Sequence, residues 1–305
     1  MNMEAGAALS VEGGRTDGAF AALLQAILEE NPLRAAGFIV TIYGDVVEPR
    51  GGVVWIGNLI ETCAEVGISE TLVRTAVSRL VAAGQLSGER EGRRSFYRLA
   101  APARAEFAAA AQLLYGPPEA ADWHFVQLTG QAPDDAMQVL ERAGHARLGP
   151  RLAVGARPLP TLNQPAVVFR AEVASGDENL RDFATDHWNL APHAEAYRGF
   201  LGRFGELADL IATGARLSPA DCLVARLLLV HRFRLVVLRD PRLPQSALPD
   251  DWPGEAARSL FNALYLRLSP QADLHVSRHF VTSTGALPEA SDATRRRGAL
   301  LLERG

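Results

Sequence analysis

The sequence has no lysine, only two cysteines and no long uninterrupted hydrophobic run. The few cysteines argue against a disulfide framework or a metal site, and the interrupted hydrophobic run argues against a membrane span. Cys63 and Cys222 lie in apolar helical surroundings without disulfide or metal-ligand spacing, which suits a reducing cytosol. Three arginines and a histidine interrupt the most hydrophobic stretch, residues 223–238, which predicts a buried helix and not a membrane span. No basic region precedes the first apolar stretch, so we expect no targeting signal and a cytoplasmic protein.

All 31 basic residues are arginine, and two explanations stay open. One is a biased genomic composition that also enriches Ala, Gly and Leu. The other is a preference for bidentate contacts to phosphate or carboxylate. The net charge of −4 means that charge alone does not hold the chain on nucleic acid or on a membrane, so any DNA contact needs a local basic patch. A length of 305 residues allows two or three domains.

The motifs of several common enzyme classes are also missing. The sequence has no GxSxG, P-loop, GxGxxG or Cys/His nucleophile pair, and its seven histidines lack the spacing of a metal site. The adjacent carboxylates Asp134-Asp135 and Asp250-Asp251 look like helix-start or turn residues. We therefore predict no catalytic residue, no metal and no cofactor, and we do not expect an enzyme.

Residues 68–99 have the pattern of one helix followed by a short β-hairpin. Ser69 can cap the helix start, and Gly84 can end the helix. Apolar residues recur between them at helical spacing and predict one buried stripe: Leu72, Val73, Ala76, Val77, Leu80 and Val81. Leu86 begins a strand, residues 87–94 form a turn rich in Gly and Arg, and residues 95–99 return as a second strand. This is the outline of a winged helix-turn-helix.

The other face of this helix and the hairpin carry the side chains that we expect to contact DNA. Arg74 and Arg79 can pair bidentately with guanine edges, and the hydroxyls beside them can contact bases or phosphates. Arginines in the hairpin can follow the phosphate backbone. For the helix alone, a solvated charged face is an equally good interpretation, but the adjoining hairpin favours DNA. The predicted DNA-binding residues are Ser69, Thr71, Arg74, Thr75, Ser78, Arg79, Arg90, Arg93 and Arg94.

Residues 231–241, HRFRLVVLRDP, concentrate arginine on a mainly apolar helix. Arg232 and Arg239 are seven residues apart and share a helix face, whereas Arg234 points elsewhere. Arginine in such surroundings must be paired or must bind an anion. One interpretation is internal pairing with carboxylates such as Asp221, Asp240 or Asp250. The other is a ligand anion such as a CoA phosphate, for which the candidate effector-binding residues are Arg232, Arg234 and Arg239.

Composition and periodicity divide the chain into an α+β multidomain arrangement. Residues 1–30 form a tail with a short leading helix, and residues 31–116 form the winged helix-turn-helix domain. Residues 117–176 have a β-α-β-β-(α)-β order that fits a ferredoxin-like domain, with a very short or missing second helix near residues 160–164. Residues 177–290 form a helical domain, and residues 291–305 form a tail without a core face, which we expect to fray.

Motifs at both ends of the chain resemble the PaaX family, repressors of phenylacetic acid degradation operons. They read TIYGDVVEPRGGVVWIGNLI, GISETLVRTAVSRLVAAGQL and GRRSFYRL, then LLLVHRFRLVVLRDPRLPQSALPDDWPGEAARSLFNALY. The likeness runs in order from about residue 35 to residue 268, with a weaker middle. It implies a winged helix, a central Cas2-like ferredoxin fold and a helical C-terminal domain with effector and dimerisation roles. It also implies a cytoplasmic homodimer that binds double-stranded operator DNA and is released by phenylacetyl-CoA.

Two other functions stay open. The middle segment resembles Cas2 nucleases, but those enzymes end their first strand in a metal-binding Asp, where this chain runs from Leu128 into Thr129-Gly130. That departure disfavours a metal-dependent nuclease. An acyl-CoA-binding module without a DNA role would use Arg232 and Arg239. The function that we expect is sequence-specific transcriptional repression of aromatic, phenylacetate-type catabolic genes, relieved by an aryl-acyl-CoA.

Overall fold

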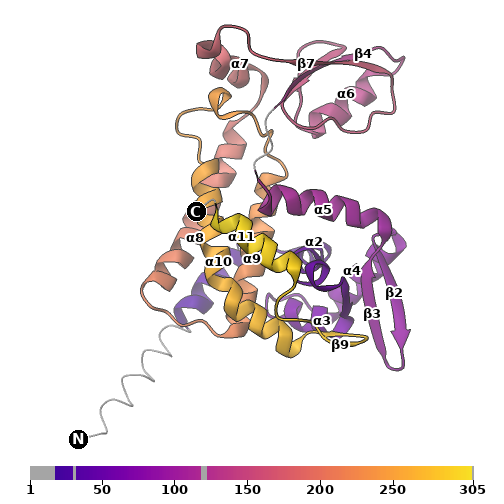
Figure 1. Ribbon diagram of the computed structural model, residues 1–305, viewed down its shortest axis with the longest axis vertical. Helices are drawn as coiled ribbons and strands as arrows, with labels where there is room; N and C mark the ends of the chain where they lie inside the picture. The colour runs from indigo at the N-terminus through magenta and orange to yellow at the C-terminus, as the bar shows by residue number, and fades with distance from the viewer. Residues whose placement is uncertain (1–17, 30–31, 118–121, 304–305) are drawn as a thin grey trace, which may run out of the picture. The chain divides into compact units, whose positions relative to one another are not determined.

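The computed structural model describes residues 18–29, 32–117 and 122–303. It is a mixed α and β structure with three small sheets, and it packs into two compact units (Figure 1). Unit 1 comprises residues 1–117, 200–234 and 256–305, and unit 2 comprises residues 118–199 and 235–255. The domain boundaries expected at residues 30, 116, 176 and 290 stay a prediction. Within the described ranges, no helix is long and apolar enough to cross a membrane.

The first part of unit 1 contains the helix and the hairpin that the sequence predicts over residues 68–99. Residues 18–29 are helical and bury Phe20, Leu23 and Ile27. The elements that follow are α2 (Ala35–Ile42), the π-helix η1 (Tyr43–Val47), the 3-10 turn η2 (Glu48–Arg50), β1 (Val53–Trp55), α3 (Ile56–Ala64), α4 (Glu70–Ala82), β2 (Leu86–Glu91), β3 (Arg94–Leu99) and α5 (Ala101–Tyr115). The π-helix that continues α2 has no counterpart in the sequence prediction.

Strands β1, β3 and β2 form an antiparallel sheet in that order, with β3 in the centre. Phe96 and Leu99 are both buried, and because side chains alternate along a strand, β3 buries one residue on each of its faces. The hairpin turn is shorter than the predicted residues 87–94, because pairing continues to Glu91 and Arg94 and leaves only Gly92 and Arg93 between the strands. Gly92 has φ 59°, and glycine at the first position of a two-residue turn suits type II′.

The C-terminal helices are α8 (Ala191–Ala212), α9 (Pro219–Val237), α10 (Gly254–His279) and α11 (Asp292–Leu302), with the short β8 (Val281–Thr282) and β9 (Gly285–Ala286) before α11. The sequence pattern predicts a helix over residues 255–268, but α10 continues across Pro270 and fully buries Ala272 and Val276. The expectation that residues 291–305 fray is also wrong. Ser291 and Thr294 form a capping box at the start of α11, and Leu301 is fully buried.

Unit 2 holds a four-stranded antiparallel sheet in the order β5-β6-β4-β7. Its elements are β4 (Trp123–Leu128), α6 (Pro133–Arg142), β5 (Ala146–Arg147), β6 (Leu152–Gly155), β7 (Ala166–Ala171), η3 (Asp177–Asn179), α7 (Leu180–His187) and η4 (Gln245–Ala247). The core of unit 2 lies between β4 and α6, where Val126 of the strand and Met137 and Leu140 of the helix are in one buried cluster. Residues 160–164 are not helical, and Leu162 packs against this core from an extended segment. Pro158, Pro160 and Pro165 remove backbone donors that a helix there would need.

Candidate nucleic-acid interface

Helix α4 is fixed at both ends by local hydrogen bonds. A tight turn precedes it, in which the Ile68 N–H donates to the Cys63 carbonyl at 3.0 Å. The Ser69 hydroxyl then accepts from the Leu72 N–H at 3.5 Å, as the sequence predicts for an N-cap. At the other end, Gly84 has φ 69°, and the Gln85 N–H donates to the Leu80 carbonyl at 2.9 Å. This is the Schellman pattern, which ends the helix sharply before β2.

The helix rests on the core of unit 1 through a narrow buried stripe: Val73, Ala76, Val77 and Leu80. Two residues of the predicted stripe lie outside it, because Leu72 is 55% exposed and Val81 is 39% exposed. The six candidate residues of this segment are all exposed, namely Ser69, Thr71, Arg74, Thr75, Ser78 and Arg79. The predicted division between a core face and a polar face is therefore confirmed, with a smaller core face.

The hairpin arginines Arg90, Arg93 and Arg94 are exposed, and two of them, Arg90 and Arg94, make contacts within the hairpin and its sheet. The Arg94 guanidinium lies 5.0 Å from the centroid of the Trp55 ring, a cation–π distance. Arg90 Nε donates to the Gly92 carbonyl at 3.2 Å, and Arg98 pairs with Glu89 across the strands at 2.9 Å. Arg93 lies in the turn itself and is exposed.

A groove of about 420 Å³ separates α4 from the hairpin, which lies beside it in Figure 1. Arg74 and Ser78 line it from the helix, and Arg90 and Tyr97 line it from the hairpin. The structure thus brings helix and hairpin candidates to one concave surface. Arg74 Nε also donates to Glu70 Oε1 at 2.7 Å, in an exposed pair of the kind that contributes little stability. This guanidinium can therefore exchange its carboxylate partner at low cost.

The three predicted effector-binding arginines differ in their surroundings. Arg232 is buried and donates to the Ile27 carbonyl at 2.8 Å, and Arg234 donates to the Gly37 carbonyl at 3.1 Å. Arg239 follows the end of α9, is exposed and belongs to unit 2. The carboxylates considered as partners have other contacts: Asp221 with Ser218, Asp240 with Tyr197 and Asp250 with Arg181. Effector binding by these arginines stays a prediction.

A cavity of about 540 Å³ in unit 2 is a second concave surface. Trp188, Leu190 and Ala194 line it from the end of α7 and the start of α8, and Trp252 and Pro253 line it from the segment before α10. Arg198 lies at this cavity and pairs with Asp251 at 2.8 Å, in an exposed ion pair. The cavity combines aromatic walls with one guanidinium. None of its lining residues was a predicted site residue.

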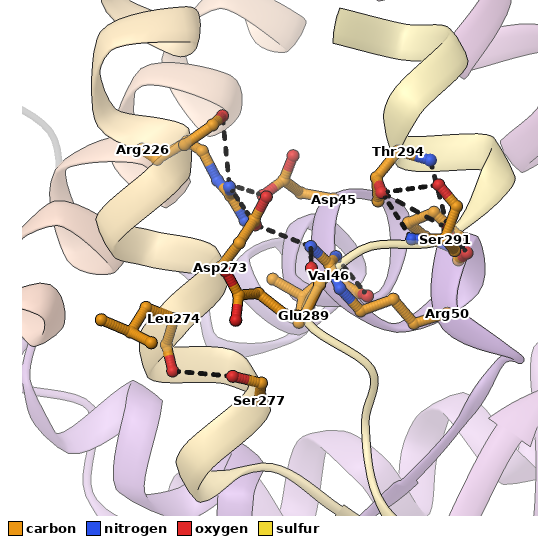
Figure 2. A network of polar contacts seen from close by, with 12 residues as sticks. Asp45, Val46, Arg50, Arg226, Asp273, Leu274, Ser277, Glu289, Ser291 and Thr294 are labelled. Carbon is orange, nitrogen blue, oxygen red and sulfur yellow. Dashed lines mark hydrogen bonds and ion pairs between the residues drawn. The ribbon is translucent and has the colours of Figure 1, made fainter.

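The sequence also gave no indication of a buried ionic network around Asp45 in the π-helix (Figure 2). Asp45 Oδ2 accepts from Arg226 Nε at 2.9 Å. Asp45 Oδ1 accepts from Arg297 Nη1 at 3.1 Å and from the Tyr115 and Tyr265 hydroxyls at 3.1 and 2.9 Å. Burial would raise the pKa of Asp45, but Arg226 and Arg297 outweigh it and hold the pKa below its ordinary value. Asp45 is therefore ionised.

A second carboxylate extends the network. Asp273 Oδ1 accepts from Arg226 Nη1 and from Arg50 Nη2, each at 2.6 Å. The partners come from η2, α9 and α10, so segments far apart in the sequence meet here. The one available sequence signal is that Arg226 interrupts an apolar run, which indicates a buried cation but does not identify its partner.

No cluster of three or more His, Cys, Asp or Glu residues suited to a metal ion occurs in the part of the chain that the structure describes.

Comparison with known proteins identifies the family. The model of the PaaX-like protein matches residues 34–103, and that of the PaaX-like protein C-terminal domain matches residues 188–278. The transcriptional repressor PaaX of Escherichia coli K12 is 32% identical over 276 residues, which cover 84% of this chain and 87% of that protein. The chain belongs to the PaaX-like family. The first PaaX-like match contains all nine predicted DNA-binding residues, and the second contains the three predicted effector-binding arginines.

Among solved structures, the chain is similar to the uncharacterized protein Rv0674 from Mycobacterium tuberculosis. The two are 22% identical, the match covers 72% of this chain and 89% of that one, and the TM-score is 0.42.

Proposed function

We propose that this PaaX-like chain is a sequence-specific transcriptional repressor that binds double-stranded operator DNA through a winged helix-turn-helix. In this proposal α3 and α4 are the two helices of the motif, α4 lies in the major groove, and hairpin β2–β3 is the wing. The observation that carries it is the groove between α4 and the hairpin, where Arg74 and Ser78 face Arg90. The E. coli relative that is named a transcriptional repressor supports the same function.

In this proposal, helix α4 recognises the bases and hairpin β2–β3 contacts the phosphates. On α4, Arg74 and Arg79 would donate to guanine O6 and N7, and the hydroxyls of Thr71, Thr75 and Ser78 would contact bases or phosphates. In the hairpin, Arg90, Arg93 and Arg94 would contact phosphates without regard to sequence. Because the net charge is −4, these local guanidiniums would supply the attraction that the whole chain lacks.

The finer features of the proposal rest on family membership. They are a homodimer that binds two half-sites, a Cas2-like ferredoxin scaffold around β4–β7, control of phenylacetate-type catabolic genes, and release by phenylacetyl-CoA without any enzymatic step. The cavity beside Trp188 and Trp252 supports an aromatic effector, because these rings give it apolar walls. Asp186 and Asp251 also line it, so an anionic group of the effector would have to compete with Asp251 for Arg198. Arg232, Arg234 and Arg239 are the alternative anion contacts.

The test is binding of the purified chain to fragments upstream of its own gene and of neighbouring catabolic genes. We expect a complex that resists random competitor DNA, weakens steeply with salt, and dissociates with phenylacetyl-CoA but not with acetyl-CoA or free CoA. Arg79→Ala should relax the preference for particular base pairs, and Arg295→Ala, an exposed arginine on α11, should not. Equal affinity for every fragment would contradict the proposed repressor, and turnover of the thioester would contradict a purely regulatory role.

A further inference from the structure

Helix α4 carries an exposed leucine in its first turn. Leu72 keeps 55% of its surface exposed, whereas the next residue, Val73, is fully buried. Its exposed neighbours in sequence and across one turn are Ser69, Thr71 and Thr75, which are all polar. Single exposed leucines are common on protein surfaces, but an apolar side chain of this size gains free energy when another apolar group covers it, so its position on the proposed recognition helix makes Leu72 a candidate apolar contact.

Helical geometry places Leu72 on the edge of the proposed base-reading face. Residues three and seven positions later lie on the same side of a helix, so Leu72 lines up with Thr75 and Arg79. The groove beside the hairpin takes Arg74, Ser78 and Val81 from the opposite edge. Leu72 is therefore turned away from the hairpin and stands at the N-terminal end of α4, the end from which recognition helices contact base edges.

The chemistry of the major groove limits what a leucine can recognise there. Guanine, cytosine and adenine present only hydrogen-bond donors and acceptors, to which a leucine offers no partner. Thymine alone adds an apolar group, its C5-methyl. We infer that Leu72 is a specificity-determining residue that packs against the C5-methyl of one thymine in each half-site. This inference rests on the proposed DNA-binding function.

The test removes the methyl and the leucine separately. Preferred sites are first selected from a random double-stranded DNA library with the full-length protein. Each thymine in the selected site is then replaced by deoxyuridine, which keeps every hydrogen-bonding group and loses only the methyl. Binding is measured for the wild-type chain, for Leu72→Ala, and for Leu72→Met, which keeps an apolar side chain of similar volume. Leu302→Ala is the matched control, because Leu302 is an exposed leucine on α11, outside α4 and the hairpin.

We expect deoxyuridine at the contacted thymine to weaken wild-type binding about fourfold for each half-site in which it is placed, the factor for one buried methyl-sized group. Leu72→Ala should bind the thymine site about as weakly as the wild type binds the uracil site, and should lose the uracil penalty. Leu72→Met and Leu302→Ala should keep the uracil penalty of the wild type. Because Leu72 is exposed, the thermal unfolding midpoint of Leu72→Ala should match that of the wild type.

The outcomes separate this inference from the function on which it rests. The role of Leu72 is overturned if no deoxyuridine in the selected site weakens binding of the wild type. It is also overturned if Leu72→Ala loses as much affinity for the uracil site as the wild type does. Either result leaves the proposed repressor function intact. Failure of the selection to enrich any sequence overturns the repressor and Leu72 recognition together.

Discussion

Arg93 and Arg94 stand at the turn of the hairpin, where each can meet a phosphate without contacting a base. Replacing both with alanine should weaken binding to operator and to random DNA by the same factor. The slope of log K against log salt should become smaller by about 1.8, since each lost phosphate contact contributes about 0.9. Filter binding or fluorescence anisotropy over a range of salt concentrations measures both quantities.

The matched control is Arg295→Ala with Arg296→Ala. This pair is also two adjacent exposed arginines, and it lies on α11, outside α4 and the hairpin. It changes the net charge by the same amount, so it should leave the salt slope unchanged. A loss confined to the operator, with random DNA bound as before, would assign Arg93 and Arg94 to base readout and contradict their role as phosphate contacts.

At the scale of single residues, periodicity predicted which side chains of α4 face outward but not where the buried stripe ends. Leu72 and Val81 lie about a quarter turn from the centre of the buried stripe, one on each side. A pattern of apolar positions therefore does not distinguish them from the buried Val73 or Leu80. Exposure at these edges depends on what packs against the helix, and that is a property of the tertiary fold.

Several elements of unit 1 contact the carboxylate of Asp45. A substitution at this residue therefore measures how much the network stabilises the unit. Asp45→Ala should lower the free energy of unfolding by about 3–5 kcal/mol, because it removes the carboxylate that Arg297 contacts and leaves the buried Arg226 with Asp273 alone. Urea unfolding followed by circular dichroism measures this loss.

Asp292→Ala is the control for the Asp45 experiment. Asp292 pairs with Arg295 at 2.7 Å, but its side chain is 91% exposed, so its removal should cost less than about 1 kcal/mol. Equal losses for the two variants would mean that the buried network contributes no more than a surface ion pair.

The elements themselves were largely predictable, and the exceptions have physical causes. The strand over residues 123–128 and the helix that became α6 follow from short-range patterns. Helix α10 continues across Pro270 because burial of Ala272 and Val276 offsets the hydrogen bond that proline cannot make. That burial depends on the tertiary fold, so the local sequence does not predict it. Helix α11 was missed because Arg297, which a sequence pattern assigns to the surface, faces Asp45.

For the whole molecule, the buried side chain of His231 should make the free energy of unfolding depend on pH. Burial, reinforced by Arg234 and Arg232, lowers the pKa of His231 to about 3, whereas an unfolded histidine titrates near 6.5. Between these values the unfolded state binds a proton that the folded state does not. Stability should therefore be complete above about pH 6.5 and should fall as the pH decreases.

The size of this effect can be isolated by substitution. From pH 7.5 to pH 5, His231 should account for a loss of about 2 kcal/mol in the free energy of unfolding. His231→Asn offers an amide where His231 Nδ1 lies 2.8 Å from the Thr41 hydroxyl, and it cannot titrate in this range. Its stability should change less over the interval, as measured by urea unfolding at each pH. An unaltered pH slope in this variant would contradict the assignment to His231.

The contact between Asp45 and Arg297 also bears on how the protein is made. The two residues are 252 positions apart, so a ribosome adding about 5–20 residues per second separates their appearance by roughly 10–50 s. Once residue 99 has been added, the nascent chain contains α4 and the hairpin, yet Asp45 lacks Arg226 until residue 226 is added and lacks Arg297 until α11 is made. The N-terminal segment therefore completes its fold only after α11 has been synthesised, and we expect a nascent chain that stalls before α11 to be a substrate for chaperones and proteases.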